Sequence, residues 1–205
     1  VITAALISGA IAGRVKFSAW LVFLPLWITL SYFPLAHMVW GGGVLSADGW
    51  FAGGEGDAAY GPIDFAGGTV VHINAGMAGL VLALVVGARV GFGRTAYRPH
   101  NIPFVMLGAA LLWFGWFGFN GSCALGANFL AQAVILNTLL AGSAGMIGFA
   151  IIEKWREGHV TSLGMITGTV AGLVGITPAA SSMAPLGALL VGIFAAAVVA
   201  FLLRF

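Results

Sequence analysis

Two ionisable side chains, Asp64 and His72, lie in a stretch of the chain that carries no other charge. The run DFAGGTVVHIN covers residues 64–74, and only uncharged residues follow it as far as Arg89. A carboxylate can attract a cation or accept hydrogen bonds from amides, and a neutral imidazole can donate or accept one. A charged residue in the middle of a membrane helix costs at least ~2.5–3.5 kcal/mol, so such residues usually mark a pathway, a relay or a bound ion.

The composition shows whether this segment lies in a membrane. Of the 205 residues, 60% are hydrophobic and 7% are charged, whereas a soluble domain carries roughly 25% charged residues. Such a chain cannot cover a water-exposed surface, so we expect a polytopic protein surrounded by a lipid bilayer. The eight Lys and Arg residues are too few and too scattered for a nucleic-acid-binding surface. The single cysteine excludes an internal disulfide.

Long apolar runs define the expected membrane spans, because a helix needs about 20 apolar residues to cross a bilayer. Six complete spans are expected at 17–40, 63–88, 102–123, 126–152, 160–178 and 186–204. Residues 1–12 are apolar but too short to cross, and without an initial Met they resemble the end of a truncated helix. The predicted fold class is therefore all-α, with a single transmembrane helical bundle over 1–205 that is a fragment of a longer protein.

The basic residues indicate how these spans are oriented. With alternating spans all eight fall on one side: Arg14, Lys16, Arg89, Arg94, Arg98, Lys154, Arg156 and Arg204. The opposite side holds the loop 41–62, which contains acidic residues and no basic one. The positive-inside rule then places this loop outside and the basic segments in the cytoplasm of a plasma or inner membrane. Asp64 would lie at the outer mouth of its helix, with His72 about 12 Å deeper at 1.5 Å per residue.

Glycine is unusually frequent, at 32 of the 205 residues. Gly164, Gly168 and Gly172 form a stripe of small residues that lets helix backbones approach closely within lipid. Similar small residues surround His72, so its imidazole would face a gap or another helix instead of bulky side chains.

Asp64 and His72 each allow two interpretations. Asp64 precedes Gly67 and Gly68, whose amides need acceptors at a helix start, so it is an N-cap, a fixed charge that attracts a cation, or both. His72 is a buried structural residue or a functional group, and its place in a membrane span favours function. No metal site is expected, because the remaining histidines fall in other segments: His37, His100 and His159.

Several aromatic residues have spacing that could serve a cation. Trp116, Phe119 and Cys123 share one helix face that leads to the outer end of their span. They are either ordinary lipid- or core-facing residues, or the wall of a mouth whose π faces attract cations. Trp40 ends the first complete span, and it is either a partner of that mouth or one residue of an interfacial aromatic belt.

Three motifs, in order along the chain, resemble those of the ammonium transporter (Amt) family. They are AHMVWGGG at 36–43, DFAGGTVVHIN at 64–74 and GWFGFN at 115–120. The turn PHN at 99–101 and the run GLVGITP at 172–178 agree with them. The resemblance covers almost the whole chain and is closer to the Amt branch than to the Rhesus branch. It corresponds to the end of the third through the ninth of the family's usual eleven spans.

The resemblance implies a transporter and not an enzyme, and it implies no cofactor. It also implies a homotrimer in which each subunit contains one narrow hydrophobic pore. Ammonium or methylammonium would be captured at an outer vestibule and deprotonated, and ammonia would then pass two facing histidines. The implied vestibule residues are Trp40, Phe119 and Cys123, with Ser122 adjacent. Asp64 would recruit and deprotonate ammonium, and the implied pore-lining residues are His72, Trp116, Phe65 and Tyr32.

Two departures from the family pattern affect this interpretation. Cys123 stands where the vestibule hydroxyl is expected, and a thiol is a weaker hydrogen-bonding group. The second pore histidine would lie after Phe205. An alternative to transport is an ammonium-sensing module of a signalling protein. The basic cytoplasmic segments, including 89–100, are candidates for docking a regulatory protein of the PII type.

Overall fold

The protein is described from a computed structural model that covers residues 1–54, 60–95 and 98–203. Its contacts divide the chain into two compact units, unit 1 over Val1–Tyr97 and unit 2 over Arg98–Phe205. The regular secondary structure of the described residues is helical, apart from one isolated antiparallel bridge between Gly53 and Tyr60. The predicted all-α class is therefore confirmed. Some of the charges that set the predicted orientation lie outside the described residues: Glu55, Asp57 and Arg204.

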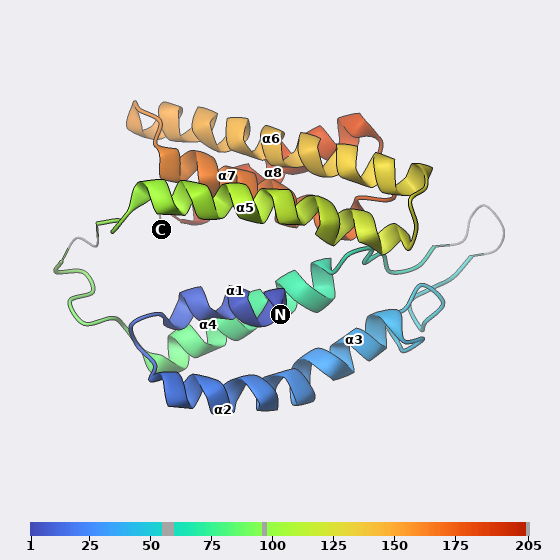
Figure 1. Cartoon of the computed structure of the whole chain (residues 1–205), viewed down its shortest axis with the longest axis horizontal. Coiled ribbons are helices and arrows are strands. Elements are labelled where there is room, and N and C mark those ends of the chain that lie inside the picture. The colour runs from blue at the N-terminus through green and yellow to red at the C-terminus, as the bar shows by residue number, and fades with distance from the viewer. Residues whose placement is uncertain (55–59, 96–97, 204–205) are drawn as a thin grey trace. The chain divides into compact units, whose positions relative to one another are not determined.

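Unit 1 contains a long apolar rod and a shorter helix pair (Figure 1). The rod is α2 (Phe17–Trp27), the π-helical η1 (Ile28–Tyr32) and α3 (Phe33–Trp40), and the second span is the π-helical η3 (Gly68–Ile73) followed by α4 (Asn74–Val86). The single span expected at 17–40 is therefore built from three segments. Pro25 and Pro34 explain the widened turn between them, because proline has no N–H to donate and its ring crowds the preceding turn.

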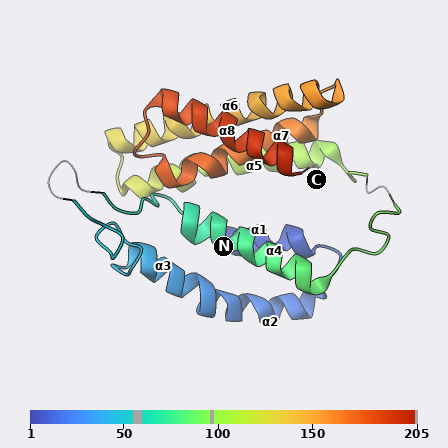
Figure 2. The ribbon, with the colours of Figure 1, turned by 180° about the vertical axis from the view of Figure 1, so that it is seen from behind.

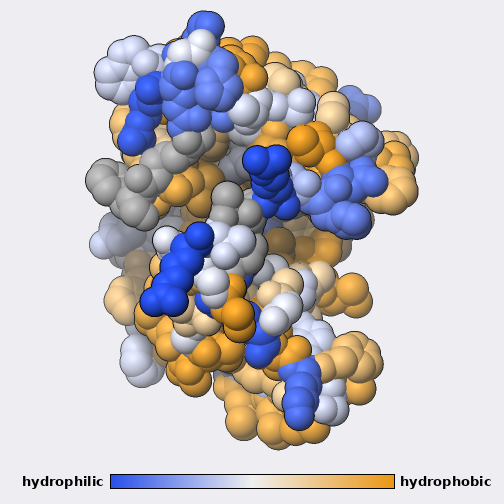
Figure 3. Space-filling model, turned by 90° about the vertical axis from the view of Figure 1, so that its left-hand side faces the viewer, coloured by the Kyte–Doolittle hydropathy of each residue, from blue (hydrophilic) through white to orange (hydrophobic). Residues whose placement is uncertain are grey.

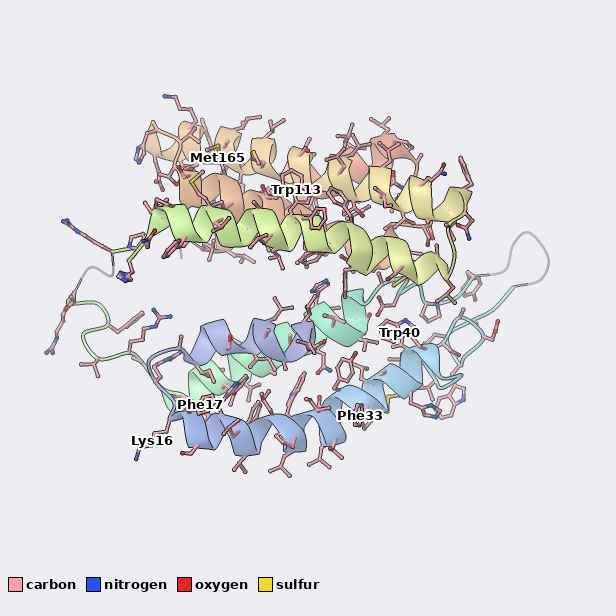
Figure 4. All side chains as sticks on the ribbon, viewed as in Figure 1. Lys16, Phe17, Phe33, Trp40, Trp113 and Met165 are labelled. Atoms are coloured by element: carbon pink, nitrogen blue, oxygen red, sulfur yellow. The ribbon has the colours of Figure 1, made fainter. Side chains whose placement is uncertain are left out.

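The short helix α1 (Ile2–Ile11) packs against α4, as both ribbon views show (Figures 1 and 2). A Cβ on Gly79 would meet the Ala10 methyl at 3.3 Å, so the two helices are as close as small residues allow. Within this unit, Lys16 and Trp40 mark opposite ends of the rod (Figure 4). The Lys16 end also holds the last residues of α1 and α4, because Arg14 donates to the carbonyl oxygens of Ala10 and Gly87.

Unit 2 consists of four long helices joined by short turns. They are α5 (Ile102–Gly121), α6 (Phe129–Glu157), α7 (Ser162–Ile176) and α8 (Pro185–Leu202), with the 3-10 turns η4 (Ser122–Ala124) and η5 (Thr177–Ala179). Helices α6, α7 and α8 lie side by side, and α5 packs on α6 and α7 (Figures 1 and 2). A Cβ on Gly172 or Gly192 would overlap the Ala141 carbonyl oxygen, so glycine is required where α7 and α8 cross α6.

Side-chain caps fix where three of the four helices of unit 2 begin, α5, α6 and α7. Asn101, Asn128 and Thr161 accept hydrogen bonds from the amides of Phe104, Ala131 and Gly164, each at 3.0 Å. The span expected at 126–152 therefore starts after Asn128 and runs on to Glu157, where Gly158 adopts a left-handed conformation. Such asparagine and threonine caps satisfy the otherwise unpaired first amides of a helix.

The described residues include six helical spans that are long and apolar enough to cross a bilayer. Large apolar side chains lie exposed along their sides, among them Leu84, Phe114 and Phe194. On the face that Figure 3 shows, many side chains are orange and hydrophobic, and the blue hydrophilic groups gather in separate patches. The chain is thus a multi-pass helical membrane protein.

Candidate functional site

Asp64 caps the start of the helix that carries His72. Its Oδ1 accepts hydrogen bonds from the amides of Gly67, at 2.9 Å, and Gly68. Its Oδ2 accepts from Thr69 and Val70, at 2.9 and 3.0 Å. One carboxylate therefore satisfies four amides that have no acceptor within the helix. Because a carboxylate offers about four lone-pair sites, these four amides can occupy all of them.

Gly67 makes this cap possible. Its φ of +116° lies in the left-handed region, which glycine adopts without steric penalty. A Cβ there would also meet Val71 Cγ2 at 2.5 Å and the Trp40 ring at 3.5 Å. The turn therefore depends on glycine for both its backbone conformation and its close packing.

Trp40 is attached to the same turn. Its Nε1 donates a 2.7 Å hydrogen bond to the backbone carbonyl oxygen of Asp64, which joins the end of α3 to the start of η3. The indole remains 48% exposed, so it is held in place while part of its surface stays open. An aromatic face presented in this way can attract a cation, and the neighbouring carboxylate adds a negative field.

His72 lies inside the helix that Asp64 caps. Its side chain is only 9% exposed, and it belongs to the π-helical segment η3. Just below it, the Ser31 hydroxyl donates a 3.0 Å hydrogen bond to Asn74 Oδ1, which joins η1 to the start of α4. This hydrogen bond ties the π-helical segment η1 to the residue that follows the π-helical segment η3, and such segments are frequent at functional sites.

The other two predicted residues of unit 1 flank this arrangement. Tyr32 ends η1, and its ring lies 6.5 Å from that of Trp27 and 6.1 Å from that of Phe33. Phe65 is half-buried in the turn that follows Asp64. In unit 1, the helix start that Asp64 caps is therefore followed closely by His72, has Phe65 in its turn, and is hydrogen-bonded to Trp40 at the end of α3.

In unit 2, Trp116 is fixed by a partner that the sequence motifs did not reveal. The indole is 1% exposed, and its Nε1 donates a 3.0 Å hydrogen bond to Thr177 Oγ1. The threonine hydroxyl in turn donates to the carbonyl oxygen of Leu173 at 2.7 Å. The Phe119 ring packs edge-on against Trp116, with centroids 5.6 Å apart.

Cys123 and Ser122 lie where α5 ends. The Cys123 thiol donates to the Phe119 carbonyl oxygen at 3.3 Å, so its proton is directed to its own helix. Ser122 is exposed and opens the turn η4. Trp116, Phe119 and Cys123 thus follow one another along the end of α5, as their spacing predicts.

A second buried polar pair supports this end of α5. Asn120 Nδ2 donates to Thr138 Oγ1 at 3.0 Å, and both residues are fully buried. Asn120 and Thr177 lie within the motifs at 115–120 and 172–178, but these motifs do not indicate which residues pair; Thr138 is marked only as a hydrogen-bonding residue in an otherwise apolar span. In a membrane such residues must find protein partners, because lipid tails offer none.

These features define a polytopic helical membrane protein whose polar side chains gather at helix starts and ends. The chain belongs to the Ammonium Transporter Family, whose sequence profile matches residues 1–205. It is 54% identical over 197 residues to an ammonium transporter of Mycobacterium bovis, covering 95% of this chain and 40% of that protein. The predicted family is therefore correct, and the chain spans about two fifths of that relative.

Solved structures agree with this assignment. Mep2 of Candida albicans superimposes with a TM-score of 0.84 at 34% identity, covering 97% of this chain and 42% of that one. A protein named Sensor Amt Protein gives a TM-score of 0.84 at 30% identity, covering 98% of this chain and 50% of that one. The name of the family and the name of the Mycobacterium bovis relative both describe transporters and not enzymes.

Proposed function

We propose that the full-length protein carries ammonium across a membrane. Ammonium would be captured at an outer vestibule and deprotonated, and ammonia would cross a hydrophobic, histidine-lined pore while the proton is relayed. Family membership and relatives named ammonium transporters support this reading. Its physical basis is that ammonium can shed its charge, whereas K⁺, an ion of similar size, cannot and must pay the full desolvation energy in an apolar pore.

The observation that carries the proposal is the Asp64 cap. One carboxylate starts the His72 helix, and its backbone carbonyl holds the half-exposed Trp40 indole. Trp40 would bind the cation through its π face, Asp64 would supply the attracting field, and His72 would contact ammonia in the dry pore. Phe65 and Tyr32 would complete the pore wall on this side.

The corresponding proposal for unit 2 concerns the end of α5. Phe119 would act as a gate, with Trp116 behind it in the pore wall. Cys123 or the adjacent Ser122 would offer the polar contact to the cation. Because the Cys123 thiol already donates to its own helix, its sulfur would act as a weak acceptor.

The assembly and orientation of the protein are also proposals. The positive-inside rule places the loop 41–62 outside a plasma or inner membrane. Family membership supports a homotrimer, methylammonium as a second substrate, and a PII-type regulator at the basic cytoplasmic segments.

The test is the ammonium current of the full-length protein in proteoliposomes. His72→Ala is expected to lower the current at least ten-fold or to weaken K⁺ rejection. His37→Ala is the matched control, because His37 is exposed on α3 in the same unit and should leave both properties near the wild-type values. Undiminished current and unchanged K⁺ rejection in His72→Ala would contradict the proposed pore role.

A second candidate function is ammonium sensing. The likeness to the Sensor Amt Protein favours it, as does the thiol at the position of the expected vestibule hydroxyl. A sensor would bind ammonium without carrying a sustained current. Isothermal titration of the full-length protein beside the current measurement distinguishes the two functions.

A further inference from the structure

A pocket inside unit 1 combines an apolar wall with two polar side chains. It lies between the rod and α4 and has a volume of about 300 Å³. Apolar side chains form most of its wall: Phe23, Trp27, Met77, Ala78, Val81 and Leu82. Among the described residues, Ser31 and Asn74 are the polar ones in its lining. The transport proposal gives no role to this pocket or to its two polar residues.

Asn74 has a hydrogen-bond donor that the fold does not use. Its side chain is only 8% exposed, and its Oδ1 accepts the 3.0 Å hydrogen bond from the Ser31 hydroxyl. Its Nδ2 is also buried, but it has no acceptor among the residues that the structure describes. Native proteins rarely leave a buried N–H unpaired, because this costs free energy. A ligand that brings an acceptor to Nδ2 recovers that free energy.

Ser31 supplies the complementary group. Its hydroxyl hydrogen is used in the bond to Asn74, but a hydroxyl oxygen also has two acceptor lone pairs. The pocket therefore presents a donor on Asn74 beside an acceptor on Ser31. A hydroxyl group satisfies both, because it accepts one hydrogen bond and donates another. A carbonyl group can only accept, and an ammonium ion can only donate.

The pocket favours an uncharged ligand with an apolar body. The segments 17–40 and 65–88, which form it, contain no Asp, Glu, Lys or Arg. An ion in such surroundings would lose its hydration without gaining a partner of opposite charge. The rings of Phe23 and Trp27 are stacked, with centroids 6.5 Å apart and planes 22° apart. They give the wall a flat aromatic surface on which another ring can pack.

We propose that this pocket binds a small uncharged alcohol with an aromatic body. Its hydroxyl accepts from Asn74 Nδ2 and donates to Ser31 Oγ, while its ring packs on Phe23 and Trp27. An apolar pocket with a few converging polar groups is the usual form of a small-molecule site. Met77 in its wall is 54% exposed, so the ligand enters from the side of the helices. The site does not require that the protein conduct ammonium.

The test is fluorine NMR of the full-length protein in detergent, titrated with 4-fluorobenzyl alcohol and, separately, with 4-fluorotoluene. The two probes share a ring, but only the first has a hydroxyl group. Asn74→Leu is expected to raise the dissociation constant of the alcohol about ten-fold, as the loss of one hydrogen bond at a buried N–H implies. The constant of the toluene should stay within about two-fold of the wild type. Comparing variant with wild type for the same probe cancels its partition into detergent.

A second pair of variants tests the location without changing either polar residue. Ala78→Leu places a larger side chain in the wall of the pocket and should weaken the binding of both probes at least about five-fold, because the added methyl groups take up ligand space. Ala19→Leu is the matched control, because Ala19 is exposed on α2 and does not line the pocket. Its effect on either probe should stay below about two-fold.

Several results would overturn the proposal. If the wild type does not bind the alcohol up to its solubility limit, water or another part of the full-length protein occupies the pocket. An equal change for the two probes in Asn74→Leu would remove the role of the hydroxyl group. Unchanged binding of both probes in Ala78→Leu, or an equal loss in Ala19→Leu, would place the bound probe elsewhere on the protein.

Discussion

Replacing Asp64 by asparagine is expected to destabilise the start of the His72 helix. The carboxylate accepts hydrogen bonds from four amides, two on each oxygen. An asparagine oxygen can still accept two of them, but the amide nitrogen would face two N–H groups, donor against donor. Each hydrogen bond to a charged group contributes about 1.5–3 kcal/mol. Because Asp64 is only half-buried, we use the lower end of that range. The loss of two hydrogen bonds then lowers the free energy of unfolding by about 3 kcal/mol.

The assay is thermal unfolding of the full-length protein in detergent. On the scale of a domain of about 150–250 residues, a loss of about 3 kcal/mol corresponds to a fall in Tm of roughly 6–12 °C. Asp48→Asn is the matched control, because it removes the same charge from the exposed loop that follows α3, and its Tm should stay within about 1 °C of the wild type. Equal Tm values for Asp64→Asn and Asp48→Asn would refute the capping role and leave Asp64 as an electrostatic residue alone.

Three further predictions concern unit 2. Thr177→Val should lower the free energy of unfolding by about 1–3 kcal/mol in denaturant titration, because the buried Trp116 N–H loses its acceptor; no loss would show that water replaces the hydroxyl. Gly172→Ala should lower the Tm by several degrees, since its Cβ would overlap a carbonyl oxygen, whereas Gly108→Ala, in open space, should not; matching Tm values would mean that the helices shift freely. Cys123→Ser should lower the half-saturating methylammonium concentration of the current about five-fold, as a gain of about 1 kcal/mol implies, and an unchanged value would exclude this side chain from the vestibule.

The sequence predicts the helical class well because apolar runs bounded by charges leave few alternatives in a bilayer. It also offers a helix cap as one of two compatible interpretations of Asp64, since an acid before two glycines is a local signal. It does not predict that one carboxylate serves four amides, because this depends on the left-handed turn at Gly67. The sequence also does not predict the π-helical turn inside the span at 17–40. The reason is similar, because the hydrophobicity of a segment does not show how two prolines change its backbone hydrogen bonds.

Contacts between distant segments are the other part that the sequence leaves open. Trp116 and Thr177 are 61 residues apart, and Ser31 and Asn74 are 43 apart. Each polar residue can be recognised as unusual in an apolar span, but its partner depends on how the helices pack. The anchoring of Trp40 to the Asp64 carbonyl is likewise visible only in three dimensions.

The central claim is that the protein carries ammonium and rejects ions that cannot lose a proton. The most direct measurement compares the currents of the full-length wild-type protein in proteoliposomes under equal inward gradients of ammonium and potassium. We predict a saturable ammonium current and a potassium current at the level of protein-free liposomes. Equal currents for the two ions, or ammonium binding without any current, would contradict the account.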